Sequence, residues 1–189
     1  MLQTLRQMTN EITIGGDTSC SGGVYILWLR VAAPLAVVFG RFHGGQPIAV
    51  PAGNYFYVGS ALNGLGARLL RHATRRGDHP PHALRDQLAG CLAAAGLPAR
   101  PPAAKRLRWH VDYLLDEPDA ALIGVWAWRT AAPLESALAA WLAAQPDISP
   151  LAQGLGASDD PGRTHLLQVA QDSYPVCATS KEWNADDAE

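Results

Sequence analysis

Hydrophobic and polar positions divide the first third of the chain into short extended segments. β-branched and aromatic residues are concentrated in GVYILWLRV, and a turn at AAP leads into LAVVFGRF. A second turn, HGGQ, and a Pro-Ala-Gly turn precede a third apolar run. These runs and their short connections predict an antiparallel sheet of three or more strands, near residues 23–30, 35–41 and 54–59.

After the third strand the apolar residues recur at helical spacing. Leu65, Leu69 and Ala73 predict a helix over residues 62–75. A second helix is predicted over residues 82–95 and a third over residues 132–144, with a proline in its first turn. The apolar stripe of the third helix consists of Leu134, Leu138, Trp141 and Leu142. We expect the first and third helices to pack on the sheet, which makes the fold class α+β.

The rest of the chain sets the expected limits of the domain. ALIGVWAW is typical of a buried strand, and a last strand is predicted after a glycine loop. We expect residues 1–21 to be loose, residues 22–175 to form a single domain and residues 176–189 to form an acidic tail. The Pro-rich stretch at about 76–106 has the character of an insertion, and we expect it to form a mobile, partly helical lid.

Composition narrows the class of protein. Hydrophobic residues make up 48% and charged residues 17% of the 189 residues, which is ordinary for a globular protein. The three cysteines lie far apart and form no CxxC pair, which argues against a Cys-based zinc site. The most apolar segment is interrupted by Arg30 and Pro34, so it is not a membrane span. We therefore expect a cytoplasmic protein without a membrane partner.

Charge is distributed unevenly although the formal net charge is only -2. From Gly22 to His110 the chain has eleven Arg or Lys residues but only two acidic ones, Asp78 and Asp86. A basic half with acidic flanks is weakly indicative of an anionic ligand.

The strongest candidate for an anion site is the glycine loop GSALNGLG at residues 59–66 and the basic helix that follows. A P-loop requires Lys and then Ser or Thr where Leu65 and Gly66 stand, and a dinucleotide fingerprint requires glycine in place of Leu69. Backbone N–H groups at a helix start can still hold an anion, and guanidinium groups donate paired hydrogen bonds to phosphate. The alternatives are a flexible turn and a solvated basic face. The basic residues of this helix are Arg68, Arg71, His72 and Arg75.

Other polar groups carry weaker signals. His79 and His82 in HPPH are metal-ligating residue types without a rigid frame. His110 and Asp112 would lie on one side of an extended segment, either as partners of a site or as a polar strand face. Glu135 stands in the first turn of its helix, where a carboxylate favours the helix dipole, and it is alternatively a ligand.

A pair of short motifs, one helix motif and one glutamate resemble features of the GIY-YIG nuclease superfamily. GVY at residues 23–25 and YVG at residues 57–59 are similar to the paired motifs that name it, with Val in place of Ile in both. ARLLRH is similar to the helix that carries the superfamily's Arg, and Glu135 resembles its metal-binding Glu.

A narrower resemblance covers most of the chain. Five motifs resemble, in order, those of a GIY-YIG-like family of unknown function from bacteria and archaea: GVYIL, PAGNYFYVGSAL, ARLLRH, WHVDYLL and GLGASDD…THL. In that family cysteines usually surround the last glycine loop, where this chain has Asp160 and Gly162. The departure bears on activity more than on fold.

The resemblance implies a metal-dependent endonuclease that hydrolyses phosphodiester bonds in DNA, in repair or in mobile-element processing. Glu135 would bind one divalent metal ion, Mg or Mn, Arg68 would hold the scissile phosphate, and Tyr25 or Tyr57 would position or deprotonate the attacking water. The residues implied in substrate contacts are Gly59, Ser60, Arg71, His72 and Arg75. The alternative is a non-catalytic module that binds nucleic acid or a protein partner, in which the tyrosines only pack.

Overall fold

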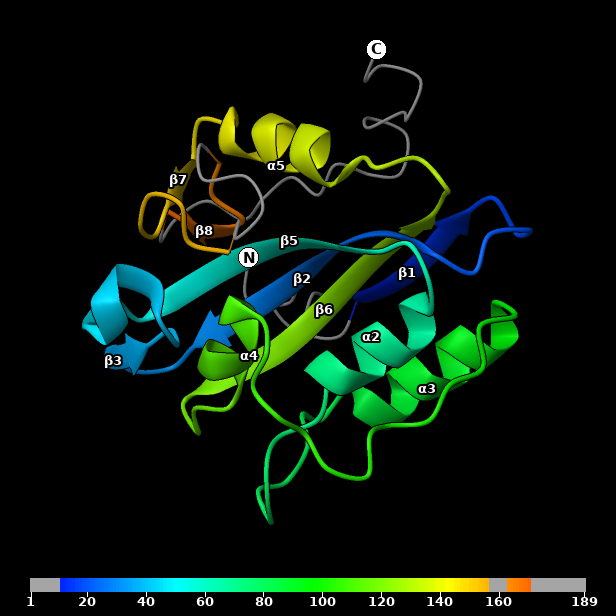
Figure 1. Cartoon of the computed structure of the whole chain (residues 1–189), viewed down its shortest axis with the longest axis horizontal. Coiled ribbons are helices and arrows are strands. Elements are labelled where there is room, and N and C mark those ends of the chain that lie inside the picture. The colour runs from blue at the N-terminus through cyan, green and yellow to red at the C-terminus, as the bar shows by residue number, and fades with distance from the viewer. Residues whose placement is uncertain (1–10, 157–162, 171–189) are drawn as a thin grey trace, which may run out of the picture.

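The computed structural model describes residues 11–156 and 163–170, and its central feature is a six-stranded sheet with the strand order β1-β6-β2-β5-β8-β7 (Figure 1). Neighbouring strands are antiparallel except for β1 and β6, which are parallel. The strands are β1 (Glu11–Gly16), β2 (Gly23–Val31), β5 (Gly53–Ala61), β6 (Ala120–Arg129), β7 (Ile148–Pro150) and β8 (Leu166–Val169). The predicted α+β class with an antiparallel sheet is confirmed.

Four helices flank this sheet. The helices are α2 (Leu65–His72), α3 (Arg85–Ala94), α4 (His110–Leu115) and α5 (Glu135–Ala143). α5 lies on one face of the sheet, and α2, α3 and α4 lie on the other (Figure 1). Within the described ranges, no helix is long and apolar enough to span a membrane.

Each central strand supplies both faces of the sheet, because successive side chains of a strand point in opposite directions. Tyr25 and Leu27 of β2 belong to the core shared with α2–α4, whereas Ile26 and Trp28 belong to the core under α5. β5 alternates in the same way, so that Tyr57 lies on the same face as Tyr25. The two tyrosines of the paired motifs therefore share one core.

The prediction that residues 35–41 belong to the main sheet is wrong. β3 (Leu35–Val38) pairs with β4 (Pro47–Val50) in a separate two-stranded sheet, with the short 3-10 helix η1 (Phe42–Gly45) between them. β2 pairs with β5 and β6 along its whole length, so both of its edges are already occupied. A tight turn between two β-rich runs predicts their proximity but not their pairing.

Two further expectations need correction. Residues 11–16 were expected to be loose, but they form β1, which gains a parallel partner from the distant strand β6. The stretch at about 76–106 was expected to be a mobile lid, but its leucines belong to the core. Those leucines are Leu84, Leu88, Leu92 and Leu97. The predicted acidic tail and the positions Asp160 and Gly162 lie outside the described residues.

Candidate functional site

Ser60, near the end of β5, joins the starts of two helices on opposite faces of the sheet. Its hydroxyl donates a hydrogen bond to Oε2 of Glu135, the first residue of α5. Its carbonyl oxygen accepts a hydrogen bond of 3.2 Å from Nη1 of Arg68 in α2. The chain enters α2 through Gly64, whose φ of 72° is in the left-handed region that glycine favours. This junction places a carboxylate and a guanidinium beside the same residue.

Glu135 is held as an ionised carboxylate. Nδ1 of His165 lies 3.0 Å from its Oε1, although it does not meet the geometry of a hydrogen bond. Burial acts to raise the pKa of Glu135, but its contacts with His165 and Ser60 and the charge of Arg68 outweigh burial and lower the pKa below its usual value. The Glu135 side chain remains 30% exposed, so it is accessible from solvent.

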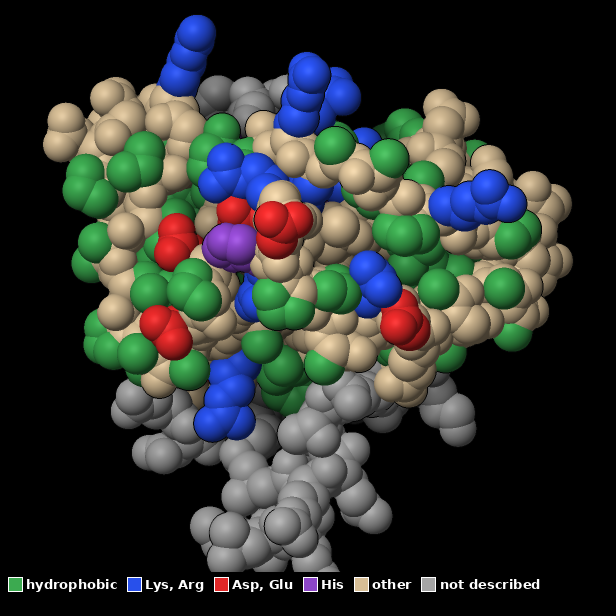
Figure 2. Space-filling view, turned by 90° about the horizontal axis from the view of Figure 1, so that it is seen from below, with side chains coloured by type: hydrophobic (Ala, Val, Ile, Leu, Met, Phe, Trp, Pro, Cys, Tyr) green, Lys and Arg blue, Asp and Glu red, His purple; other side chains and the backbone are tan. Residues whose placement is uncertain are grey.

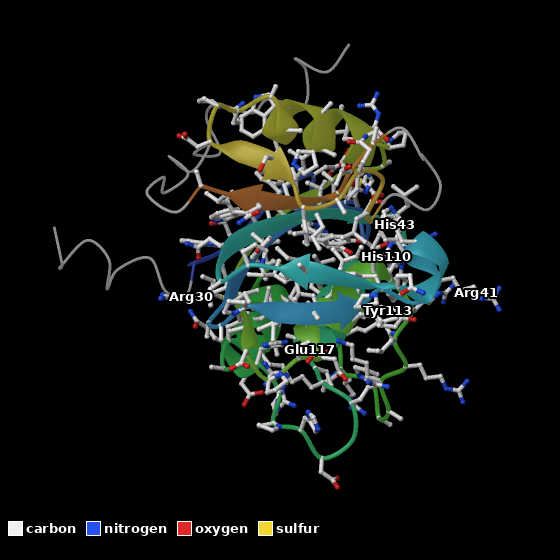
Figure 3. All side chains as sticks on the ribbon, turned by 90° about the vertical axis from the view of Figure 1, so that its left-hand side faces the viewer. Arg30, Arg41, His43, His110, Tyr113 and Glu117 are labelled. Atoms are coloured by element: carbon white, nitrogen blue, oxygen red, sulfur yellow. The ribbon has the colours of Figure 1, made fainter. Side chains whose placement is uncertain are left out.

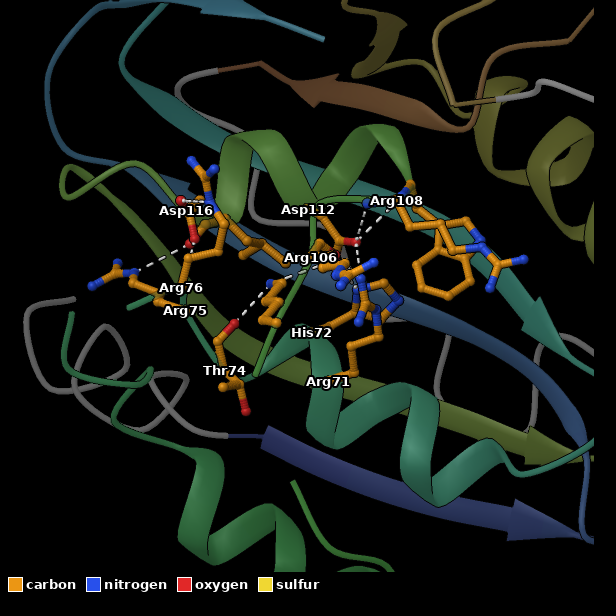
Figure 4. Close-up of polar contacts among 12 residues, drawn as sticks. Arg71, His72, Thr74, Arg75, Arg76, Arg106, Arg108, Asp112 and Asp116 are labelled. Carbon is orange, nitrogen blue, oxygen red and sulfur yellow. Dashed lines mark hydrogen bonds and ion pairs between the residues drawn. The ribbon is translucent and has the colours of Figure 1, made fainter. Parts of the chain in front are cut away.

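Tyr25 begins a buried chain of hydrogen bonds on the α2 side of the sheet. Its hydroxyl lies 2.9 Å from Nε2 of His72. Nδ1 of His72 in turn lies 3.2 Å from Oδ1 of Asp112, and Figure 4 shows these two side chains. A carboxylate only accepts, so Nδ1 carries the ring hydrogen and Nε2 accepts the hydrogen bond from the Tyr25 hydroxyl. None of the three side chains is exposed to solvent. The Tyr25 proton is therefore directed at His72.

Asp112 is the centre of this polar network. Its Oδ2 accepts a hydrogen bond of 3.1 Å from Arg71 and two more from the backbone N–H groups of Arg108 and Trp109. The ammonium group of Lys105 lies 3.4 Å from Oδ1, in a position without solvent exposure. Burial acts to raise the pKa of Asp112, but these contacts and the one with His72 hold the pKa well below its usual range.

The cationic and neutral members of the network respond to burial in the opposite way. Burial lowers the pKa of His72 and that of Lys105, and the Asp112 carboxylate partly offsets both shifts. His72 is therefore neutral at physiological pH, which leaves its Nε2 available as a proton acceptor.

Tyr57 and Gly59 surround Tyr25 within the sheet. The rings of Tyr25 and Tyr57 are 6.5 Å apart, and burial raises the pKa of both hydroxyls. A Cβ at Gly59, which stands opposite Tyr25 on β5, would lie 2.6 Å from the Tyr25 oxygen. The structure shows that Gly59 makes room for Tyr25, and the substrate contact that the resemblance implies for Gly59 stays a prediction.

Comparison with protein families places this site in a family. Residues 24–185 match the family described as "Domain of unknown function DUF123". The chain belongs to that family. No curated protein and no solved structure matches the chain. All the predicted site residues of the DUF123 chain lie within the matched range, so the Ser60 junction is part of the DUF123 domain.

The predicted basic residues of the DUF123 chain divide into two groups. Arg68 and Arg71 lie over the ring of Trp109, with Cζ–centroid distances of 3.7 and 4.8 Å. His72 is fully buried, and the Arg75 guanidinium donates hydrogen bonds to backbone carbonyl groups. Those carbonyl groups belong to Leu115, Glu117 and Ala120. Figure 2 shows basic and acidic side chains interspersed over the face that it presents.

His82 and His110 of the DUF123 chain contact backbone groups inside the protein, whereas His79, the other histidine of HPPH, is exposed. Nε2 of His82 lies 3.0 Å from the carbonyl oxygen of Leu115, and its Nδ1 accepts a hydrogen bond from the Leu122 N–H. His110 lies in α4, not in the predicted extended segment, and its Nδ1 accepts a hydrogen bond from the Gly156 N–H. Figure 3 shows His110 beside His43 at the β3–β4 hairpin.

Sequence reasoning found Tyr25, Ser60, Arg68 and Glu135 but missed several partners. Asp112 was named only as a possible partner of His110, and His165 was missed although it stands in the noted motif THL. Trp109 stands in WHVDYLL but was not singled out, and Lys105 carried no signal, because the contacts of both are tertiary. A cavity of about 410 Å³ lies beside α5, and no predicted site residue lines it.

Proposed function

We propose that the chain is a metal-dependent endonuclease that hydrolyses phosphodiester bonds in DNA in the cytoplasm, in the manner of the GIY-YIG nucleases that its motifs resemble. The observation that carries the proposal is the junction at Ser60, where Glu135 and Arg68 meet the same residue at the end of β5. A carboxylate next to a guanidinium is suited to a metal ion and a phosphate bound side by side.

The residues at the junction fit a magnesium or manganese ion held by one carboxylate. Magnesium is commonly bound in proteins through one or two carboxylates together with waters and substrate phosphate. Glu135 is ionised and partly exposed, and each of its oxygens keeps a lone pair beyond the contacts with Ser60 and His165. Among the described residues, no three His, Cys, Asp or Glu side chains gather into a protein cage. A bound ion would polarise a phosphate oxygen and acidify a water.

Tyr25 supports the reaction as a proton carrier. Its hydroxyl proton moves to Nε2 of His72 as its oxygen takes a proton from the attacking water, and Asp112 stabilises the imidazolium that results. Burial raises the pKa of Tyr25, and the charge of Arg68 acts in the opposite direction. Tyr25 fits this role better than Tyr57, whose hydroxyl has no hydrogen-bond partner in the described part of the chain.

Arg68 holds the scissile phosphate. Its Nη1 donates to the Ser60 carbonyl, and the stacked ring of Trp109 fixes the plane of the guanidinium. The remaining N–H groups are then preorganised for the negative charge that develops on the phosphate oxygens in the transition state.

One observation favours the alternative of a non-catalytic module that binds nucleic acid or a protein partner. Both oxygens of Glu135 already have protein contacts, with the Ser60 hydroxyl and with Nδ1 of His165, and these compete with a metal ion for the carboxylate. In this alternative Glu135 serves only to connect α5 with β5 and β8.

The test is a cleavage time course with the purified full chain and MgCl₂ or MnCl₂. The substrates are supercoiled, nicked, branched and single-stranded DNA, together with RNA. Glu135→Gln should abolish metal-dependent cleavage and leave DNA affinity and melting temperature nearly unchanged. Arg68→Ala should lower the rate by roughly 10²–10³-fold and weaken binding as well.

The outcomes separate the two functions. Metal-dependent cleavage that persists in Glu135→Gln would contradict the metal role of this carboxylate. DNA binding by the wild-type chain without cleavage of any substrate would favour the non-catalytic module. A large fall in melting temperature in Glu135→Gln would assign the carboxylate to the stability of the α5–β5 connection.

A further inference from the structure

Trp109 gathers three guanidinium groups around one indole ring. Cζ of Arg68 lies 3.7 Å from the ring centroid, that of Arg71 lies 4.8 Å away and that of Arg108 lies 5.1 Å away. The ring also meets the edge of His72 at 5.8 Å, so its position is fixed by the buried network below it. The indole is therefore a rigid platform for three positive charges.

The three guanidinium groups differ in what neutralises them. Arg71 forms an ion pair of 3.1 Å with Asp112. Arg68 donates to the neutral carbonyl of Ser60, and within the described ranges the Arg108 side chain makes no contact other than that with the indole. Like charges this close repel one another, since the Debye length is about 10 Å in 0.1 M salt. Among the described residues, Asp112 is therefore the one carboxylate that forms an ion pair with these three guanidinium groups.

The charged groups around Trp109 also include more cations than carboxylates. Lys105 adds a fourth cation beside Asp112, and Glu135 is the second carboxylate near Arg68. Asp116 also acts on Lys105, so four cations face three carboxylates here, whereas the whole chain has a formal net charge of -2. A local positive excess in an acidic chain indicates an anionic ligand at this place.

We propose that Trp109 and its three arginines bind two successive phosphates of one DNA strand. Arg68 holds the scissile phosphate, and Arg108 together with the unpaired Nη1 of Arg71 holds the neighbouring one. The inference rests on the proposed function, because the two share the scissile phosphate. Because two successive phosphates are bound, the proposed substrate is a polynucleotide strand and not a single nucleotide.

The platform explains why such a subsite would be effective. A guanidinium that is stacked on an indole loses less side-chain freedom when it binds phosphate than a free surface arginine does. Trp109→Phe keeps a ring for stacking, whereas Trp109→Ala removes it. The two variants separate the role of the platform from the bulk of the side chain.

The test measures DNA affinity in the full chain carrying Glu135→Gln, so that the probe is not cut. The probe is a fluorescein-labelled single-stranded thymidine oligonucleotide, and binding is followed by anisotropy at several salt concentrations. Arg108→Ala should weaken binding about tenfold and reduce the slope of log K against log salt by about 0.7. Trp109→Ala should weaken binding by a similar factor, and Trp109→Phe should stay within about twofold of the parent.

Arg30→Ala is the matched control. Arg30 is exposed and lies five residues beyond Tyr25 on β2, roughly 17 Å along the strand. Figure 3 shows Arg30 and Arg41 at opposite edges of the view. Arg30→Ala should therefore leave the affinity within about twofold of the parent, and melting curves for all variants exclude unfolding as a cause.

A second probe tests the number of phosphates directly. A thymidine trinucleotide has two phosphodiesters, and a neutral methylphosphonate in place of one of them should weaken binding to the parent. The same replacement should weaken binding to Arg108→Ala by a smaller factor, because this variant already lacks the arginine that contacts the replaced phosphate. An equal effect in both proteins would overturn the two-phosphate site.

The remaining outcomes separate this inference from the nuclease proposal. Suppose that the wild-type chain cleaves DNA with metal, but that Arg108→Ala and Arg30→Ala bind the probe with the same affinity. This result would overturn the subsite and leave the proposed function intact. Binding that shows the expected Arg108 and Trp109 effects without any cleavage would support the subsite and contradict the nuclease. Failure of the parent to bind either probe would overturn the subsite whatever the cleavage assay shows.

Discussion

The two faces of the sheet are built from the same strands but bury different chemistry. The α2–α4 face carries Tyr25 and Tyr57 and continues into the polar network around His72, Asp112 and Lys105. The α5 face carries an aromatic cluster whose larger members have no hydrogen-bond partner within the described residues. Those members are Trp28 and Trp126, which stack at 5.8 Å. The fully buried polar network thus lies on the α2–α4 face, whereas the titratable groups next to α5 are Glu135 and His165 of the Ser60 junction.

The separation of the polar network from the apolar α5 face explains how a small domain can be stable with buried charges. Burying an ion pair costs desolvation that Coulomb attraction recovers only when the geometry is good. The apolar α5 face supplies hydrophobic stabilisation, at about 25 cal/mol per Å² of buried apolar area, that does not depend on protonation. The Ser60 junction lies where the two faces meet, since Glu135 comes from α5 and Arg68 from α2.

The largest expected effect is the removal of Asp112. Asp112→Ala leaves Lys105 buried without a carboxylate and removes the acceptor of His72, so we expect a loss of about 3–5 kcal/mol in the free energy of unfolding. Urea denaturation at pH 7 measures it. Asp86→Ala is the control, because the Asp86 side chain is 85% exposed and its pair with Arg85 is a surface contact. Equal losses in the two variants would contradict the division between the faces.

The second effect is a loss of stability in acid that arises on the polar face. Burial, with smaller contributions from the charges of Arg75 and Lys105, lowers the pKa of His82 from 6.5 to about 3. The unfolded chain therefore binds more protons than the folded chain between these values, and stability falls as pH falls through this window. His82 alone contributes about 2–3 kcal/mol of loss at pH 4.5. Asp112, whose pKa is lowered, adds to the loss below about pH 4.

His82→Gln tests the origin of this acid loss. An amide can donate to the Leu115 carbonyl and accept from the Leu122 N–H as the imidazole does, but it does not titrate. Urea denaturation of both proteins at pH 7, 5.5 and 4.5 should show a shallower decline in the variant. Parallel declines would assign the acid loss to other groups.

The sequence predicted the local elements better than their partners. Helical periodicity located α2 and α5, and the β-rich runs located β2 and β5. It did not predict the pairing of β1 with β6, because a parallel partner more than a hundred residues away leaves no local pattern. The leucines of α3 were visible, but proline-rich flanks led to the interpretation as a lid.

The site shows the same limit. Tyr25, Arg68 and Glu135 stood in motifs, so their types and order were sufficient to select them. The link through Ser60, the contact with His165 and the charge of Lys105 depend on how helices from both faces meet the end of β5. Such contacts are tertiary, and a single sequence does not specify them.

The third effect tests the fit of Tyr25 against β5. Gly59→Ala places a methyl group 2.6 Å from the Tyr25 oxygen, so the ring must move away from its hydrogen bond with His72. We expect a loss of about 1–3 kcal/mol in the free energy of unfolding, the usual cost of overpacking. Gly90→Ala in α3 is the matched control, because nothing lies within 4 Å of its Cβ, and it should stabilise by up to about 1 kcal/mol. A neutral Gly59→Ala would show that Tyr25 is not tightly held.

The smallest effect compares one aromatic residue from each face. Tyr25→Phe removes the hydroxyl that His72 accepts from and leaves a buried nitrogen unpaired, so it should cost about 1–3 kcal/mol. Trp28→Phe removes an indole N–H that has no partner among the described residues, and this gain offsets part of the lost stacking and area. Its net cost should therefore stay within about 1 kcal/mol. Urea denaturation measures both, and the cleavage assay should show loss of activity only for Tyr25→Phe. A greater cost for Trp28→Phe, with activity lost in both variants, would mean that the α5 face shapes the site as directly as the polar face does.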